Sequence, residues 1–358
     1  MNALQIARHR LISQQLTSTK CTTAAELVAR FGALQAQEYT HAKWSLGLRL
    51  AHLTDKSIEK DLDRGRILRT HVLRPMWHLT TPQDIRWLLM LTAPQVHAAN
   101  ATMYRKLELN TTVFTRCNDL LFRILEGKVQ LTRDMIGQAL AREKINAEGP
   151  RLSYLLMQAE LEGIICSGAR QGNQFTYALL EERVPTRKTK DPEKALADLT
   201  TRYFISRGPA TIHDFSTWSG LALTECKKGL AMVGSGFLHQ KIDNEEYFFS
   251  AHASSELSQF RNLYMLPVYD EFMAGYKNQE ALLAYRNNLT PVPVLQFDNA
   301  LVWDGQIIGT WTRTIGTKNI ELNYDLFKPF SKTQQTSFKK AIRRYEAFNE
   351  RTVNTASD

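Results

Sequence analysis

The strongest constraint on the fold of this chain is an internal repeat of three helices followed by a hairpin. Residues 119–182 are predicted to form a helix, a second helix capped by Thr132, a third helix, and two extended runs. Residues 195–250 repeat this order, and their extended runs flank the Asp243-Asn244 dipeptide, which is a hairpin signal. This succession is typical of winged helix-turn-helix domains.

A looser copy of the same order comes first in the chain. Thr23 and Glu26 have the spacing of a capping box, and Gly32 ends the helix that they open. Thr211 and Asp214 have a similar spacing in the last copy. The elements predicted after Gly32 are helices over 41–50 and 56–64, an extended alternating run over 67–80, and a helix capped by Thr81 with Pro82 at its first position. The first 250 residues therefore predict three tandem winged helices.

Beyond residue 257 the sequence changes to short β-rich runs separated by turn residues. These runs cover 262–272, 290–298, 300–314 and 319–324. Asp304-Gly305, inside the third run, predicts a tight turn between two strands. The pattern favours a small antiparallel sheet or barrel.

The predicted fold class is α+β, in six successive parts. These are three tandem winged helix-turn-helix domains (1–112, 113–184 and 185–254), a small antiparallel β-barrel-like domain (255–330), a basic C-terminal helix (331–351) and a disordered polar tail (352–358). The clearest boundary is the linker 183–194, which is rich in charge and contains proline.

Composition excludes several classes of protein. The longest apolar runs are far shorter than a membrane span, and basic residues occupy the place of a signal peptide's apolar core, so we expect a cytoplasmic protein. The four cysteines are far apart and lack zinc-site spacing, which predicts reduced thiols, no metal and no cofactor. The net charge of +9 is compatible with nucleic-acid binding and equally with many basic enzymes.

Four segments together resemble the AlkZ/YcaQ family of bacterial DNA glycosylases. They are Gly32-Ala33-Leu34-Gln35-Ala36-Gln37, then Leu73-Arg74-Pro75-Met76-Trp77-His78-Leu79, then Leu266-Pro267-Val268-Tyr269-Asp270-Glu271-Phe272 with Gly275-Tyr276-Lys277, and finally the run from Trp303 to Trp311. The resemblance implies three winged-helix domains with a β-barrel, and an enzyme that excises alkylated purines and unhooks interstrand crosslinks. It also implies double-stranded DNA as the partner, near the nucleoid, and we expect a monomer.

The family's catalytic signature, a glutamine, an apolar residue and then glutamine or aspartate, corresponds to Gln35, Ala36 and Gln37. Two amides can hold a water near C1′ of a nucleotide whose alkylated base is already a good leaving group. A carboxylate would add general-base strength, so the pair predicts a slow catalyst that spares normal guanine. The alternative is that Gln35 and Gln37 only cap the preceding helix.

Five further residues are candidates for supporting or substrate-binding roles. Arg74 and His78 lie four apart in a predicted strand and so share one face, where His78 either orients water or is a half-buried structural histidine. Asp270 and Glu271 either polarise water and position a basic side chain, or cap a turn. Tyr39 is close enough to the glutamines to stack on a base.

Scattered basic residues are candidates for phosphate contacts along a DNA groove. They are Lys43, Arg49, Arg69, Arg74 and Arg151, and the alternative for each is a solvated side chain. Trp44, Trp77 and Tyr269 are candidates for base stacking, with the protein core as their alternative. The hairpin at Asp243 has an acidic tip and is therefore not expected to enter a groove.

Two other classes of function remain open from the sequence. A non-enzymatic winged-helix regulator would need a basic recognition helix, but the candidate helices at 151–162 and after Thr224 mix acidic and basic residues. A family member that serves only as a protein scaffold would have no affinity for DNA.

Overall fold

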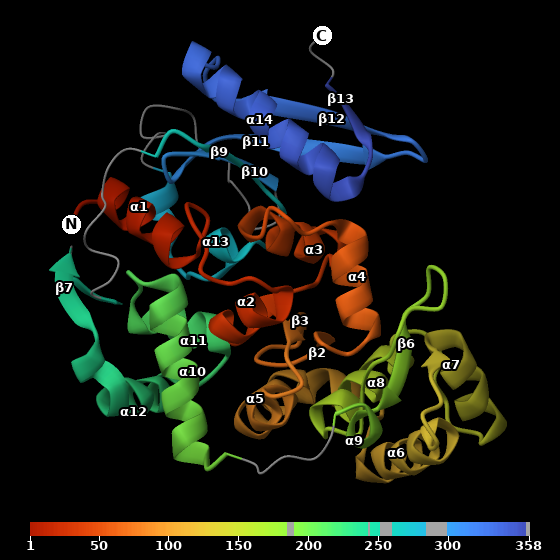
Figure 1. Ribbon diagram of the computed structural model, residues 1–358. Helices are drawn as coiled ribbons and strands as arrows, with labels where there is room; N and C mark the ends of the chain where they lie inside the picture. Colours follow the sequence, from red (N-terminus) through yellow and green to blue (C-terminus); the bar gives the residue numbers. More distant parts are fainter. Residues whose placement is uncertain (185–189, 243, 251–259, 284–298, 356–358) are drawn as a thin grey trace.

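The computed structural model describes residues 1–184, 190–242, 244–250, 260–283 and 299–355. It is a mixed α+β fold in which helical units surround a central set of helices and a five-stranded sheet lies at one side (Figure 1). The predicted runs at 290–298, the tip residue Asp243 and part of the linker, 185–189, lie outside the described residues.

The first unit combines helices with a small sheet. Its elements are α1 (Ala3–Ser13), α2 (Ala24–Phe31), β1 (Leu34–Gln35), α3 (Tyr39–Arg49), α4 (Asp55–Asp63), β2 (Leu68–His71) and β3 (Trp77–Thr80), followed by the long helix α5 (Ile85–Lys106). The capping box of Thr23 and Glu26 is present, and Gly32 ends α2 with φ 77°, as predicted. The strand order is β1-β3-β2.

The prediction of one extended run over 67–80 is wrong, because this segment is a hairpin. β2 and β3 are antiparallel, with His71 opposite Trp77. Leu73 has φ 67°, and Pro75 cannot donate a backbone hydrogen bond, so the chain turns between the strands. Arg74 therefore lies in the turn and does not share a strand face with His78.

The second unit repeats the order of helices and strands. It contains α6 (Thr111–Leu125), β4 (Leu131–Thr132), α7 (Arg133–Arg142), α8 (Arg151–Leu161), β5 (Ile165–Ser167), β6 (Thr176–Leu179) and α9 (Leu180–Arg183). Its sheet has the order β4-β6-β5, which corresponds to β1-β3-β2 of the first unit. α6 begins earlier than the predicted residue 119 because the Asn110 side chain caps it by accepting from the Val113 N–H.

The third unit has the same order with a two-stranded sheet. It consists of α10 (Pro192–Arg207), α11 (Ile212–Ser219), α12 (Leu223–Val233), η1 (Gly234–Gly236), β7 (Leu238–Ile242) and β8 (Glu245–Phe249). Thr211 and Asp214 form the predicted capping box. Asn244 in the hairpin has φ 68°.

The C-terminal region is a curled five-stranded sheet with a helix packed on it. Its elements are β9 (Leu263–Leu266), α13 (Glu271–Ala274), η3 (Glu280–Leu282), β10 (Asn299–Trp303), β11 (Gln306–Ile315), β12 (Asn319–Leu326), α14 (Lys332–Asn349) and β13 (Thr352–Thr355), in the strand order β13-β12-β11-β10-β9. The disordered tail predicted for 352–358 is wrong over 352–355, because these residues pair in parallel with β12. The sheet is therefore not purely antiparallel.

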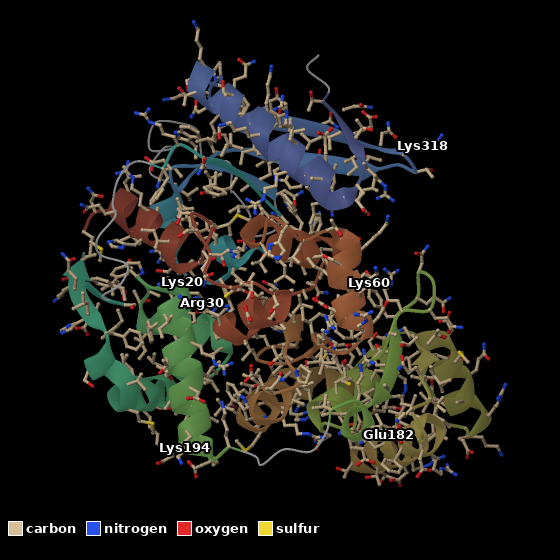
Figure 2. All side chains as sticks on the ribbon, viewed as in Figure 1. Lys20, Arg30, Lys60, Glu182, Lys194 and Lys318 are labelled. Carbon is tan, nitrogen blue, oxygen red and sulfur yellow. The ribbon has the colours of Figure 1, made fainter. Side chains whose placement is uncertain are left out.

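One hydrophobic core joins the first unit to the C-terminal sheet. Trp44 of α3 lies against Tyr345 and Phe348 of α14, and its Nε1 donates to the Met265 carbonyl. α13 is thereby held beside β1, although the two are far apart in sequence. Basic side chains are spread over helices and loops, as the labelled Lys20, Lys60, Lys194 and Lys318 illustrate (Figure 2).

Candidate functional site

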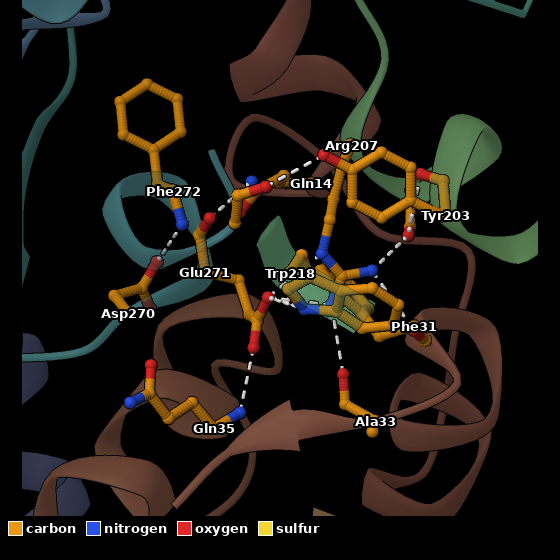
Figure 3. Close-up of polar contacts among 12 residues, drawn as sticks. Gln14, Phe31, Ala33, Gln35, Tyr203, Arg207, Trp218, Asp270, Glu271 and Phe272 are labelled. Atoms are coloured by element: carbon orange, nitrogen blue, oxygen red, sulfur yellow. Dashed lines mark hydrogen bonds and ion pairs between the residues drawn. The ribbon is translucent and has the colours of Figure 1, made fainter. Parts of the chain in front are cut away.

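Gln35 lies in β1, directly opposite His78 of β3. Its side chain is only 6% exposed, and Nε2 is 3.6 Å from the sulfur of Met76. Its backbone N–H donates to Oε1 of Glu271 at 2.8 Å (Figure 3). β1 is thus fixed from both sides, by β3 and by the carboxylate of Glu271.

Gln37, which follows β1, is exposed, in contrast to Gln35. Its Oε1 accepts from the Trp77 N–H at 3.3 Å. The Arg69 guanidinium donates to the carbonyls of Ala36, at 3.0 Å, and Gln37, at 3.3 Å. Among the described residues neither glutamine side chain hydrogen-bonds to the end of α2, so the helix-capping alternative has no support.

Glu271, at the start of α13, supports this segment from behind. Its Oε2 accepts from Nε of Arg207 at 2.9 Å, from Nη2 of Arg207 at 2.7 Å and from Nε1 of Trp218 at 3.0 Å (Figure 3). Arg207 also donates to the carbonyls of Phe31 and Ala33, just before β1. Both carboxylate oxygens are occupied, which favours positioning of β1 over activation of water.

Asp270 forms a second buried ion pair with Arg49. The Arg49 guanidinium donates to both Asp270 oxygens, at 2.8 and 2.9 Å, and its other N–H groups reach Gln14 and Ser45. Burial raises the pKa of Asp270, but Arg49 and the hydrogen bonds from Ser45 and Phe272 outweigh it and lower the pKa overall. The predicted phosphate contact of Arg49 is therefore not supported, because no donor is left for it.

His78 is completely buried and has one unused ring nitrogen. Nδ1 lies 2.9 Å from the Met76 carbonyl and therefore carries the proton, which leaves Nε2 as an acceptor without a partner. Burial, and then the nearby Arg74, lower the pKa of His78 well below its usual value. At neutral pH the ring is uncharged.

Arg74, in the β2–β3 turn, is a cation with some donors that have no hydrogen-bond partner among the described residues. Nε and Nη2 are buried and make no hydrogen bond in the described part of the chain. Burial lowers the pKa of Arg74, while Glu271 opposes this shift and Arg207 adds to it. Arg74 and His78 thus place unsatisfied polar groups near Gln35, whereas the acidic residues behind β1 are satisfied.

Three other predicted contacts are structural in this geometry. Lys43 is 3% exposed and pairs with Asp55 and Glu59. Tyr39 donates its hydroxyl to Glu59 at 2.8 Å. Arg151 donates to the carbonyls of Asn146 and Leu107, next to its own helix. The phosphate contacts predicted for Lys43 and Arg151 are not supported by these positions.

Aromatic residues named from the sequence divide between the core and the neighbourhood of the glutamines. Trp44 is a core residue, 1% exposed. Trp77 lies under the Arg69 guanidinium, with 4.3 Å from Cζ to the ring centroid, and against His71 at 4.0 Å between centroids. His71 also pairs with Glu160 at 2.5 Å, which agrees with a structural role.

Arg207 and Trp218 are the residues of this site that sequence reasoning missed. They lie in α10 and α11, and Arg207 is separated from Ala33, just before β1, by 174 positions in the sequence. No local pattern marks them, because an arginine in a helix is usually solvated. In the described ranges no group of His, Cys, Asp and Glu side chains is arranged to hold a metal ion, and none of the helices there is long and apolar enough to span a membrane.

Comparison with known proteins identifies the class of protein. The fold matches the solved structure of the Streptomyces sahachiroi DNA glycosylase AlkZ with a TM-score of 0.80 and 18% identity, over 99% of this chain and 100% of that one. A curated S. sahachiroi protein, "Interstrand DNA cross-link repair glycosylase", is 22% identical over 322 residues, or 86% of each chain. At this identity the structural match establishes the fold, and the family profile gives the class of protein, the DNA glycosylases.

The family profile named DNA glycosylase AlkZ-like matches residues 28–348. The chain belongs to this family, as its resemblance in the four sequence segments indicated. Its members are hydrolases that act on DNA, and the matched residues include both motif glutamines and the acidic pair of α13.

Proposed function

We propose that this protein hydrolyses the N-glycosidic bond of N7-alkylated or interstrand-crosslinked purines in double-stranded DNA, as a monomer, and that Gln35 and Gln37 position the water. The observation that carries the proposal is the fixation of the Gln35–Gln37 segment by β3 and Glu271. A segment held at both faces presents its amides in a constant geometry, which is what positioning of water requires.

The chemistry follows from the pairing of the two carboxylates behind β1. Glu271 and Asp270 are each committed to an arginine, so neither is free to act as a strong general base. Hydrolysis with two amides is fast enough only when the departing base is already cationic, as an N7-alkylpurine is. Normal guanine is then spared.

Crosslinked substrates constrain the binding mode. A nucleotide tethered to the opposite strand cannot rotate freely out of the helix as in ordinary base flipping. An open arrangement of three winged-helix units around the duplex suits such a substrate, and the activity for which the S. sahachiroi relative is named supports crosslinks as the lesion. Phosphates would be held by exposed basic residues spread over several elements.

The test is an excision assay on duplexes with a single N7-alkylguanine or a mustard-type interstrand crosslink. Alkali then cleaves the strand wherever a base has been released. We expect cleavage with the wild type and little with the Gln35→Ala/Gln37→Ala variant. Equal cleavage by both proteins would keep the enzyme and refute the roles of the glutamines, whereas DNA binding without cleavage would favour a non-enzymatic DNA-binding protein.

A further inference from the structure

A pocket lies beside Gln37, between the sheet of the first unit and the hairpin of the second. Its volume is about 390 Å³, within the range of small-ligand sites. The wall toward the first unit is formed by Arg69 and Trp77, and the wall toward the second by Phe175 and Tyr177. The hairpin that ends in β6 rises beside α4 (Figure 1), and its Arg170 N–H donates to Asp63 at 2.9 Å, which fixes it there.

The pocket is joined directly to the candidate catalytic segment. Arg69 holds the carbonyls of Ala36 and Gln37, and the backbone N–H of Trp77 donates to the Gln37 side chain. The same guanidinium lies 4.3 Å from the ring centroid of Trp77 and 4.8 Å from that of Phe175. The residues that hold Gln37 therefore also form the wall of the pocket.

Aromatic and charged groups in the pocket suit a planar ring with a polar edge. Phe175 is 39% exposed, although it is a large apolar side chain. Exposed amides at the hairpin tip, Asn173 and Gln174, offer both donors and acceptors. Asp134, with Arg133 at the start of α7, completes the lining. The Asp134 carboxylate disfavours a phosphate but accepts hydrogen bonds from the amino and imino groups of a base.

We propose that this pocket receives one unpaired nucleobase of the DNA duplex at the lesion. The assignment rests on the proposed function, since it takes the duplex to be the substrate. Stacking on aromatic side chains with hydrogen bonds to the base edge is how proteins hold extruded bases. A base bound here would keep the damaged site open while the Gln35–Gln37 segment approaches the sugar.

The test compares affinity for two duplexes of the same sequence, one fully paired and one with a single adenine opposite a tetrahydrofuran abasic-site analogue. We expect the wild type to bind the duplex with the unpaired adenine about tenfold more tightly, as one base stacked on an aromatic ring provides. Phe175→Ala should lose this preference and keep its affinity for paired DNA. Phe122→Ala is the matched control, because Phe122 is 40% exposed in the same unit but does not line the pocket.

Photocrosslinking locates the base independently of any variant. A 5-iodouracil placed at the unpaired position should attach to peptides containing Trp77, Phe175 or Tyr177. Adducts only elsewhere, or an unchanged preference in Phe175→Ala, would overturn the assignment.

Excision of N7-alkylguanine, measured with the same preparations, separates the two proposals. Excision without any preference for the unpaired base would refute the pocket and leave the proposed function standing. A preference that depends on Phe175, without excision, would support the pocket and refute the proposed function.

Discussion

The two sides of β1 differ in how completely their polar groups are paired. On the side of α13, Glu271 has partners for both oxygens and Arg49 uses all of its donors. On the side of the β2–β3 turn, Nε and Nη2 of Arg74 and Nε2 of His78 have no hydrogen-bond partner among the described residues. The α13 side has the features of a structural support. The side of the β2–β3 turn has free hydrogen-bonding groups, as expected for a ligand-binding site.

This difference teaches that charge and burial alone do not identify the functional group. All of these residues are ionisable, and three of them are buried while Arg74 is partly exposed. What separates the two sides is how many of their hydrogen bonds are made. Buried donors and acceptors without partners cost stability, so they are retained where a substrate or water completes them.

The largest expected effect follows from removing Arg207. Arg207→Ala leaves Glu271 as an uncompensated buried charge, so the free energy of unfolding should fall by about 3–5 kcal/mol. Chemical denaturation measures this change. Lys228→Ala is the control, because its pair with Glu193 is exposed to solvent and its loss should leave the free energy of unfolding nearly unchanged. Equal losses in the two variants would contradict the structural role assigned to the α13 side.

Gln37→Ala should affect chemistry and leave stability unchanged. We expect the single-turnover rate of base excision to fall about 10²-fold, because the water loses one of its two positioning groups. The melting temperature should stay the same, since the side chain is exposed. Gln138→Ala, an exposed glutamine on α7, should change neither quantity. A loss of stability comparable with that of Arg207→Ala would remove the distinction between the two sides.

Arg74→Met tests whether the guanidinium in the β2–β3 turn binds DNA or stabilises the fold. Replacement by an apolar side chain removes a desolvated cation, so stability should be unchanged or higher. DNA affinity should fall several-fold and its salt dependence should weaken, by about 1 in the logarithmic slope if Arg74 contacts a phosphate. Arg151→Met should instead lower the melting temperature, because Arg151 already donates to two carbonyls. A destabilised Arg74→Met variant would show that the cation is structural.

The smallest effect concerns pH. The pKa of His78 is lowered in the folded state, so below about pH 6.5 the unfolded chain binds a proton that the folded chain does not. The free energy of unfolding therefore decreases as the pH is lowered through this range. Asp270 behaves differently, because its lowered pKa keeps its contribution until the pH falls below about 3.8. Between pH 7.5 and 5.5, His78→Gln should therefore lose about 1 kcal/mol less stability than the wild type. Identical pH profiles would show that folding does not lower the pKa of His78.

Local signals in the sequence were sufficient for much of the helical framework. The capping boxes at Thr23 and Thr211 and the start of α7 at the Thr132 cap appear in the structure as predicted. The hairpin over 68–80 was missed because alternation continues through Leu73, and only its positive φ reveals the turn. β13 was missed because a polar strand has no pattern of its own and forms only by pairing with β12.

The candidate site was predictable only in part, for a similar physical reason. Gln35 and Gln37 could be located by their motif, but the partners of Glu271 and Asp270 come from distant helices. Lys43 and Arg49 looked like surface cations because burial of a charge depends on a partner that the local sequence does not contain.

The hydrogen bond between Gln35 and Glu271 spans 236 residues of chain, which sets when the site can form. At roughly 5–20 residues per second, a ribosome needs on the order of 10–50 s to add the segment that separates them. Throughout that interval the nascent chain contains the motif glutamines but not yet Glu271, which holds their strand in place. Contacts this distant also slow folding, since the intervening loop must close before they form. Competence for base excision is therefore a property of the finished polypeptide, acquired late and as a unit.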